Sequence, residues 1–126
     1  MRIFKTNWVA RFARRERIDD ASLKEAIERA ERGIIDADLG SGLIKQRVAR
    51  PGRGRSGGFR MIVAYRTDDR AFVVYGFAKN EGENIEDDEL QTLRDIGAEL
   101  LGQDDASFHA AVDTGALKEI GSGEEN

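Results

Sequence analysis

Two β-rich segments, residues 59–66 and 71–78, are separated only by Thr67-Asp-Asp-Arg70. Both segments are rich in β-branched and aromatic residues, and the connection between them is short and polar, which is typical of an antiparallel hairpin. Residues 51–58, just before the hairpin, contain four glycines and one proline and are incompatible with regular structure. We therefore expect a sheet with this hairpin at its centre, preceded by a flexible cationic loop.

Patterns around the hairpin predict two further strands and three helices. The strands are residues 1–5 and 43–50, and a loop over residues 36–42 precedes the second of them. The first helix carries Trp8, Val9 and Phe12 and ends at Arg17. The second is indicated by the form of a capping box at Ser22-Leu-Lys-Glu25, a stop signal at Gly33 and an apolar face of Leu23, Ala26, Ile27, Ala30 and Ile34. The third begins with Glu86-Asp-Asp-Glu89 and has an apolar face of Leu90, Leu93, Ile96, Leu100 and Leu101.

The order strand, helix, helix, strand, strand, strand, helix predicts an α+β fold in one domain, residues 1–102. Residues 103–126 are predicted to be an acidic extension with a weakly helical piece at 106–112 and a tail of disordered composition at 121–126. The longest apolar runs, residues 62–65 and 72–75, are too short to span a membrane, and the absence of cysteine excludes disulfides and thiolate metal sites. We expect a cytoplasmic protein without a metal or other cofactor.

Charge is divided unevenly along the chain, although the formal net charge is only −4. Residues 1–80 hold 18 lysines and arginines against 10 acids, a charge of +8, and residues 81–126 hold 2 against 14, a charge of −12. Residues 43–60 contain six cations and no acid, so this segment can meet a polyanion such as RNA. The cations are Lys45, Arg47, Arg50, Arg53, Arg55 and Arg60.

The segment from Lys45 to Arg60, with its GRGRSGGFR stretch, and the FAKNE stretch at residues 77–81 resemble the RelE/ParE toxin superfamily, in particular its HigB-like branch. The resemblance covers about residues 1–101. It implies a small, twisted antiparallel sheet with helices on one face, neutralised by a cognate antitoxin protein. It also implies binding at the ribosomal A site of the 30S subunit and cleavage of mRNA there. Other members of the superfamily act on gyrase instead.

Carried over from the mRNA-cleaving relatives, the functional cations are Lys45 or Arg47 with Arg50, then Arg60, then Lys79 with Asn80. This chain departs from the pattern in having Asn80 where a relative has arginine, and it offers Ile85 or Glu86 where that relative has tyrosine. Arg53 and Arg55 are expected to add RNA contacts. Phe59 and Phe77 are candidates for stacking on an unpaired base.

Metal-free cleavage of RNA requires attack of the 2′-hydroxyl on the adjacent phosphate, stabilisation of the phosphorane and protonation of the leaving 5′-oxygen. The chain has one histidine, His109, so a two-histidine mechanism is excluded. Because arginine stays protonated, the arginines at 47, 50 and 60 are predicted to stabilise charge. Lysine loses its proton more readily among other cations, so Lys79 or Lys45 is the candidate for proton transfer.

Each of these assignments has a structural alternative. The cations could form only a solvated surface, and Arg60 could pair with a carboxylate. Taken by pattern alone, Phe59 and Phe77 fit the core better than a base-stacking role, because aromatic side chains on half-buried strands usually pack. The sequence therefore favours a ribosome-dependent mRNA endonuclease, with three alternatives: a gyrase inhibitor, a protein that only binds RNA, and a toxin that has lost its activity.

Overall fold

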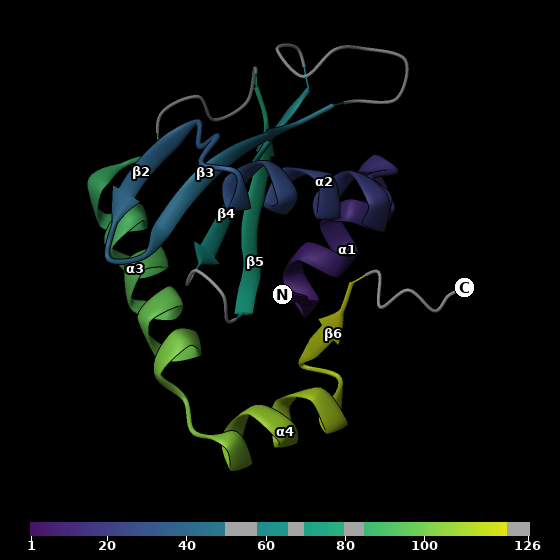
Figure 1. Cartoon of the computed structure of the whole chain (residues 1–126), viewed down its shortest axis with the longest axis vertical. Helices are drawn as coiled ribbons and strands as arrows, with labels where there is room; N and C mark the ends of the chain where they lie inside the picture. Colours follow the sequence, from purple (N-terminus) through teal and green to yellow (C-terminus); the bar gives the residue numbers. More distant parts are fainter. Residues whose placement is uncertain (50–57, 66–69, 80–84, 121–126) are drawn as a thin grey trace.

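The computed structural model describes residues 1–49, 58–65, 70–79 and 85–120. These residues form a six-stranded sheet with helices packed on it (Figure 1). The predicted α+β class and the order of its seven elements are confirmed, α4 corresponds to the helical piece predicted at 106–112, and β2 and β6 are additional. In chain order the elements are β1 (Arg2–Thr6), α1 (Asn7–Glu16), α2 (Asp20–Glu31), β2 (Ala37–Gly40), β3 (Leu43–Val48), β4 (Phe59–Tyr65), β5 (Arg70–Ala78), α3 (Asp87–Gly102), α4 (Asp105–Thr114) and β6 (Leu117–Glu119).

The strand order across the sheet is β2-β3-β4-β5-β1-β6. The predicted hairpin is present as β4 and β5, which pair antiparallel from Phe59 opposite Ala78 to Tyr65 opposite Ala71. β1 lies beside β5 and is parallel to it, so the sheet is mixed and not wholly antiparallel as the resemblance implied. Parallel neighbours need a long crossover connection, and the chain between β1 and β5 includes both α1 and α2.

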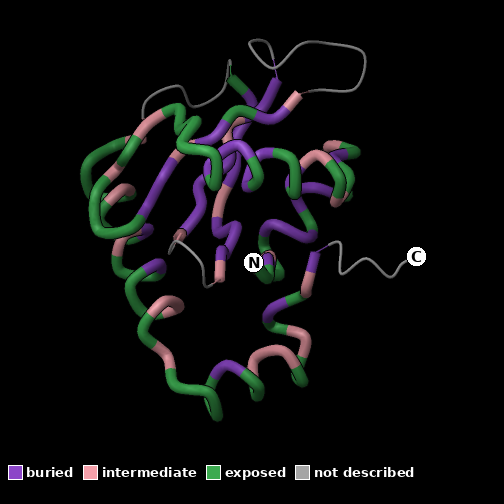
Figure 2. The backbone as a smooth tube through the Cα atoms, viewed as in Figure 1, coloured by how far each residue is buried: buried purple, intermediate pink, exposed green. Residues whose placement is uncertain are grey.

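Each face of the sheet carries a hydrophobic core. Ile3, Val63 and Val73 belong to the core on the side of α1 and α2, and Phe4 and Ile62 belong to the core on the side of α3 and α4. Figure 2 shows buried residues along the central strands. The implied placement of all helices on one face is wrong, because strand side chains alternate between faces and both alternating sets here are apolar.

Helix α2 begins one turn earlier than the capping box at Ser22 predicted. Asp19 is the N-cap, and its carboxylate accepts a hydrogen bond from the Ser22 N–H at 2.8 Å. Ile18 and Leu23, which flank this cap at the positions of a hydrophobic staple, are both buried in the same core. Gly33, with φ +84°, ends the helix as predicted. Ile34 lies beyond this end and is 51% exposed, so it is not part of the apolar face.

Residues 36–42 were expected to form a loop, but Ala37–Gly40 form the edge strand β2. Ala37 pairs with Lys45 in an antiparallel ladder with β3. The turn that follows has positive φ at Gly40, Ser41 and Gly42, which explains the two glycines. Propensity alone does not show this strand, because its pairing comes from a neighbour in the tertiary structure.

Residues 103–120, predicted as part of an acidic extension, form α4 and β6. Strand β6 pairs antiparallel with β1, with Phe4 opposite Glu119. The Arg2 guanidinium donates two hydrogen bonds of 2.9 Å to the Glu119 carboxylate. At the other end of this segment, the Arg70 guanidinium lies 3.9 Å from the ring centroid of buried Phe108. Residues 103–120 are therefore joined to the sheet by a strand pair and by arginine contacts, and the predicted tail at 121–126 lies outside the described residues.

Candidate nucleic-acid interface

The register of β3, β4 and β5 places three of the predicted cations on one face of the sheet. Arg47 stands directly opposite Arg60, and Arg60 stands opposite Phe77 on the next strand. Lys45, two residues before Arg47, is on the same face because side chains repeat every second residue. This is the face that carries α3 and α4, since Phe77 packs in that core. We call Lys45, Arg47 and Arg60 the cationic surface.

Two arginines at directly opposed positions are an unusual choice in an antiparallel sheet. Directly opposite side chains have Cβ atoms about 5 Å apart, and like charges there destabilise the pair. Arg47 is half exposed at its side chain, and Arg60 is half buried, with Nη1 donating to the Phe59 carbonyl oxygen at 3.4 Å. Both side chains can donate charge-assisted hydrogen bonds to an anion on this face.

A network of polar contacts fixes the backbone of Arg47. Its N–H donates to the Asp36 carboxylate, and its carbonyl accepts from the guanidinium of Arg29. The Arg29 side chain is only 5% exposed and also donates to Glu25 at 2.9 Å, so its charge is compensated. The Asp36 carboxylate also lies 3.8 Å from the Arg47 Nε. Asp36 therefore orients Arg47 from the side of the edge strand.

Gln46 anchors the same strand from the opposite face. Its side chain is fully buried, donates to the carbonyls of Ala26 at 2.9 Å and Ile34 at 3.1 Å, and accepts from the Asp36 N–H at 2.9 Å. Sequence reasoning missed this residue. The available signal was its position, because a glutamine at an inward-facing site of a predicted strand needs internal partners.

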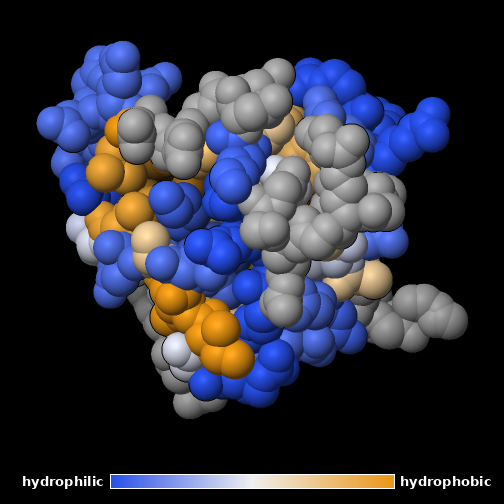
Figure 3. Space-filling model, turned by 90° about the horizontal axis from the view of Figure 1, so that it is seen from above, coloured by the Kyte–Doolittle hydropathy of each residue, from blue (hydrophilic) through white to orange (hydrophobic). Residues whose placement is uncertain are grey.

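Lys79 directly follows β5 and lies at the same end of the sheet as Arg60. Its N–H donates to the Gly58 carbonyl at 3.1 Å, and the residue is exposed. The remaining predicted cations, Arg50, Arg53 and Arg55, and the predicted RNA contact Asn80 lie outside the described residues. Figure 3, which looks onto this end of the molecule, shows hydrophilic side chains gathered beside a hydrophobic group.

The two phenylalanines predicted as stacking partners are buried. Phe59 is completely buried, and its ring meets Phe12 of α1 edge-on at 5.8 Å, on the face away from the cationic surface. Phe77 is on the cationic face but is only 7% exposed, with Tyr75 at 6.3 Å. Phe59 is therefore a core residue and does not offer a ring to a base, and Phe77 is buried beside Arg60 on the neighbouring strand.

A pocket of about 210 Å³ lies on the α3 side of the sheet and was not predicted. It is lined by Tyr75, Glu89, Thr92 and Leu93. Tyr75 stands opposite Ile62, the residue that pairs with Lys45, so the pocket lies on the same face as the cationic surface. The four carboxylates at the start of α3 have the structural role that their position predicted: Glu86 is the N-cap, and its N–H donates to Glu89 at 3.2 Å.

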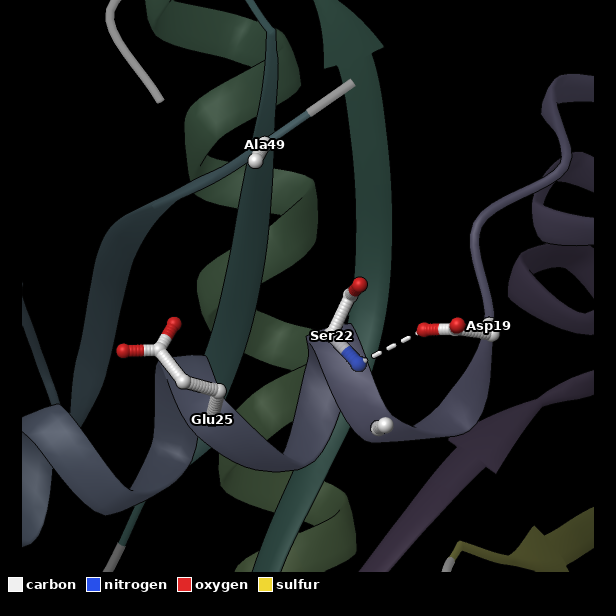
Figure 4. Close-up of a pocket in the computed structure, with 5 residues that line it drawn as sticks. Asp19, Ser22, Glu25 and Ala49 are labelled. Atoms are coloured by element: carbon white, nitrogen blue, oxygen red, sulfur yellow. Dashed lines mark hydrogen bonds between the residues drawn. The ribbon is translucent and has the colours of Figure 1, made fainter. Parts of the chain in front are cut away.

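A second pocket, of about 310 Å³, lies beside α2 (Figure 4). It is lined by Asp19, Ala21, Ser22, Glu25 and Ala49. Hydrogen bonds from Ser22 hold the pKa of Asp19 below its ordinary value, which keeps this carboxylate charged. The described residues that line it include two carboxylates, which repel phosphate, and Glu25 is already paired with Arg29.

The cationic surface suits electrostatic stabilisation of a phosphate. Arg47 and Arg60 can each donate bidentate hydrogen bonds to its oxygens. Proton transfer needs a different group, and Lys45 and Lys79 are the lysines nearest to these arginines in the strand register. His109 is exposed on α4, which is joined to the sheet through β6.

Comparison with known proteins assigns the chain to a family. No curated protein matches the sequence. None of the helices in the described ranges is long and apolar enough to cross a membrane. A model of a toxin family, described as the RelE toxin of the RelE/RelB toxin–antitoxin system, matches residues 1–120 and so includes α4 and β6. The chain belongs to the RelE toxin family.

Proposed function

We propose that this RelE family toxin cuts mRNA on the ribosome without a metal, and that a cognate antitoxin protein neutralises it. The observation that carries the proposal is the register pair Arg47 opposite Arg60 on the face beside α3. Packing alone does not favour two arginines at directly opposed positions, and two guanidinium groups on one face can bind the same phosphate.

In this mechanism the 2′-hydroxyl attacks its own 3′-phosphate, and the 5′-oxygen leaves. Arg47 and Arg60 hold the phosphate between β3 and β4 and stabilise the negative charge of the phosphorane. Lys45 or Lys79 moves the proton. The Asp36 carboxylate keeps Arg47 in place, because it accepts the backbone N–H of Arg47 and lies near the Arg47 guanidinium. The chain offers orientation and charge, and a ribosome that presents the mRNA in an extended form supplies the rest of the geometry.

The test is induction in a host that lacks the antitoxin, with mRNA 5′ ends mapped for the intact chain, Arg60→Ala and Arg11→Ala. Arg11 is an exposed cation on α1 and serves as the matched control. Growth arrest with codon-phased cuts that Arg60→Ala loses and Arg11→Ala keeps is the expected result.

Arrest with intact mRNA would refute the nuclease and point to inhibition of another target such as gyrase. Absence of arrest would point to a toxin that has lost its activity. The unfolding midpoints of both variants should match that of the intact chain, which separates loss of chemistry from loss of the fold.

A further inference from the structure

The pocket beside the cationic surface has the size and the walls for one planar ring system. Its volume of about 210 Å³ is below the roughly 300–1,000 Å³ of sites for drug-sized ligands. Of its four lining residues, Leu93 is buried, Tyr75 is half-buried and supplies an aromatic ring, and Glu89 and Thr92 are exposed. Glu89 and Thr92 bring polar atoms to it from the first turns of α3.

The aromatic wall is held in place before any ligand arrives. The Tyr75 ring stacks on Trp8 with centroids 4.6 Å apart and planes inclined by 28°, and Trp8 in turn stacks on Phe12 at 5.3 Å. Phe77 supports Tyr75 from the other direction along the strand, at 6.3 Å. A ring fixed on two sides gives stacking energy to a ligand without the entropic penalty of ordering a side chain.

Glu89 is also held in place. One of its carboxylate oxygens accepts the Glu86 N–H at 3.2 Å, which leaves the second oxygen to accept from a ligand. Thr92 uses its hydroxyl within the helix, donating to the Asp88 carbonyl at 3.0 Å. The pocket therefore joins a stacking surface to one fixed acceptor.

The charge around the pocket decides which part of a nucleotide can enter. Glu86, Asp87, Asp88 and Glu89 surround the start of α3, so a phosphate is repelled there, although a helix N-terminus alone would attract it. Phosphates are instead attracted to Arg60. This arginine stands opposite Phe77 in the β4–β5 register, and Phe77 is two residues from Tyr75 on β5. Two strand residues span about 6.6 Å, a distance that one nucleotide can bridge.

We propose that Tyr75, Glu89 and Leu93 form a subsite for an unpaired nucleobase next to the phosphate on Arg47 and Arg60. Glu89 accepts from an exocyclic amino group, as carboxylates do from cytosine, so the subsite prefers amino-bearing bases to uracil. Uracil presents carbonyl oxygens on both sides of its ring N–H, and these repel the carboxylate. This inference rests on the proposed function for its biological role, but the binding event can be measured without cleavage.

Trp8 is the only tryptophan of the chain and contacts the Tyr75 ring directly, so its fluorescence reports on the subsite. The full chain is titrated with cytidine and with uridine, which have the same size and carry no phosphate. The expected result is a saturable change in Trp8 fluorescence with cytidine. Uridine should bind roughly tenfold more weakly, which is the affinity expected to be lost with one charged hydrogen bond. Absence of a saturable cytidine response would overturn the proposal.

The matched variants are Glu89→Gln and Glu99→Gln, which remove the same charge from α3. Glutamine at 89 still accepts the Glu86 N–H, so the helix start is preserved. Glu99 is exposed near the other end of the helix and does not line the pocket. The cytidine preference should disappear in Glu89→Gln and persist in Glu99→Gln. A preference retained by Glu89→Gln would also overturn the proposal.

Mapping mRNA ends after induction of the intact chain and of Glu89→Gln separates this subsite from the nuclease. If the subsite and the nuclease are both real, the intact chain binds cytidine and the base composition at its cuts changes in Glu89→Gln. Cytidine binding with uncut mRNA would support the subsite and refute the nuclease. Cut mRNA without any cytidine response would refute the subsite alone.

Discussion

Gln46 shows how a single side chain sets the position of the cationic surface. Its amide makes three hydrogen bonds that join β3 to Ala26 within α2, to Ile34 after that helix and to Asp36. Arg47 is the next residue, and Asp36 also accepts its N–H. The guanidinium group that is proposed to hold phosphate is therefore positioned by a buried polar residue on the opposite face of the same strand.

Gln46→Met keeps the approximate shape of the side chain and leaves the Asp36 N–H and two carbonyls without this partner. The free energy of unfolding should fall by about 2 kcal/mol, because partly buried polar groups lose their hydrogen bonds. Gln91→Met is the control, since Gln91 is exposed and pairs only with Asp95 on the surface of α3. Urea unfolding measures both. Equal stability of the two variants would contradict the anchoring role.

Replacing Arg47 or Arg60 should change the salt dependence of RNA binding, whereas replacing another surface cation should not. Each is proposed to contact one phosphate, and one lost contact on single-stranded RNA lowers the dependence of log K on log salt by about 0.7. Arg47→Ala and Arg60→Ala should each show this decrease in binding to a single-stranded RNA, and Arg11→Ala should leave the slope unchanged. A decrease that is equal in all three variants would mean a diffuse charge effect.

At the scale of elements, α3 approaches the sheet closely because it carries a glycine at the contact. A Cβ at Gly97 would lie 3.2 Å from the Cβ of Ala64 and from a methyl group of Leu43. These neighbours belong to the central strands and cannot move aside freely. The same helix places Glu89 and Leu93 against the pocket, so this contact also determines the depth of the proposed base subsite.

Gly97→Leu should lower the free energy of unfolding by about 1–3 kcal/mol, because it overpacks the interface between α3 and the sheet. The matched control is Gly102→Leu at the end of the same helix, where a Cβ would have no atom within 4 Å. Chemical denaturation of both variants gives the comparison. A loss of similar size in Gly102→Leu would show that leucine affects the helix itself and not its packing.

The pairing of β6 with β1 should weaken in acid. The hydrogen bonds from Arg2 lower the pKa of Glu119 below its ordinary value, so the folded state favours the carboxylate. A carboxyl group with a lowered folded pKa contributes stability above its unfolded pKa, and this contribution disappears as the pH falls through the folded pKa.

The intact chain should therefore be more stable than Glu119→Gln at neutral pH and lose this difference in acid. Urea midpoints of both proteins between about pH 7 and pH 3 provide the measurement. The contribution is small, because the side chain of Arg2 is more than half exposed. A difference that does not change with pH would show that the pair acts through packing and not through charge.

At the scale of the whole molecule, the cations and the acids that the sequence separates have different roles in the structure. The cations of β3 and β4 form one surface, and the acids of residues 86–89 stabilise the start of α3 and border the pocket. The acidic residue Glu119, far along the chain, returns to pair with Arg2 at the edge of the sheet. The net charge of the chain therefore describes neither the cationic surface nor the acidic start of α3, because each gathers charge of one sign.

Local sequence patterns determined the hairpin, the three predicted helices and the cations that the two central strands carry. These features depend on short-range patterns. Alternation along a strand places Phe59 and Arg60 on opposite faces, and apolar spacing along a helix places Leu93 on the buried face. The strand alternation also implied that Lys45 and Arg47 share a face. It did not show which residue on another strand stands opposite them.

Tertiary structure alone decided the parallel placement of β1, the edge strand β2 and the return of β6 to β1. Each depends on a partner distant in the chain, and a short strand has no stability without its neighbour. The same reason explains why the register of Arg47 with Arg60, the hydrogen bonds of buried Gln46 and the pocket beside Tyr75 were not evident from the sequence. A side chain's neighbours across a sheet are set by pairing between strands, and local sequence does not encode that pairing.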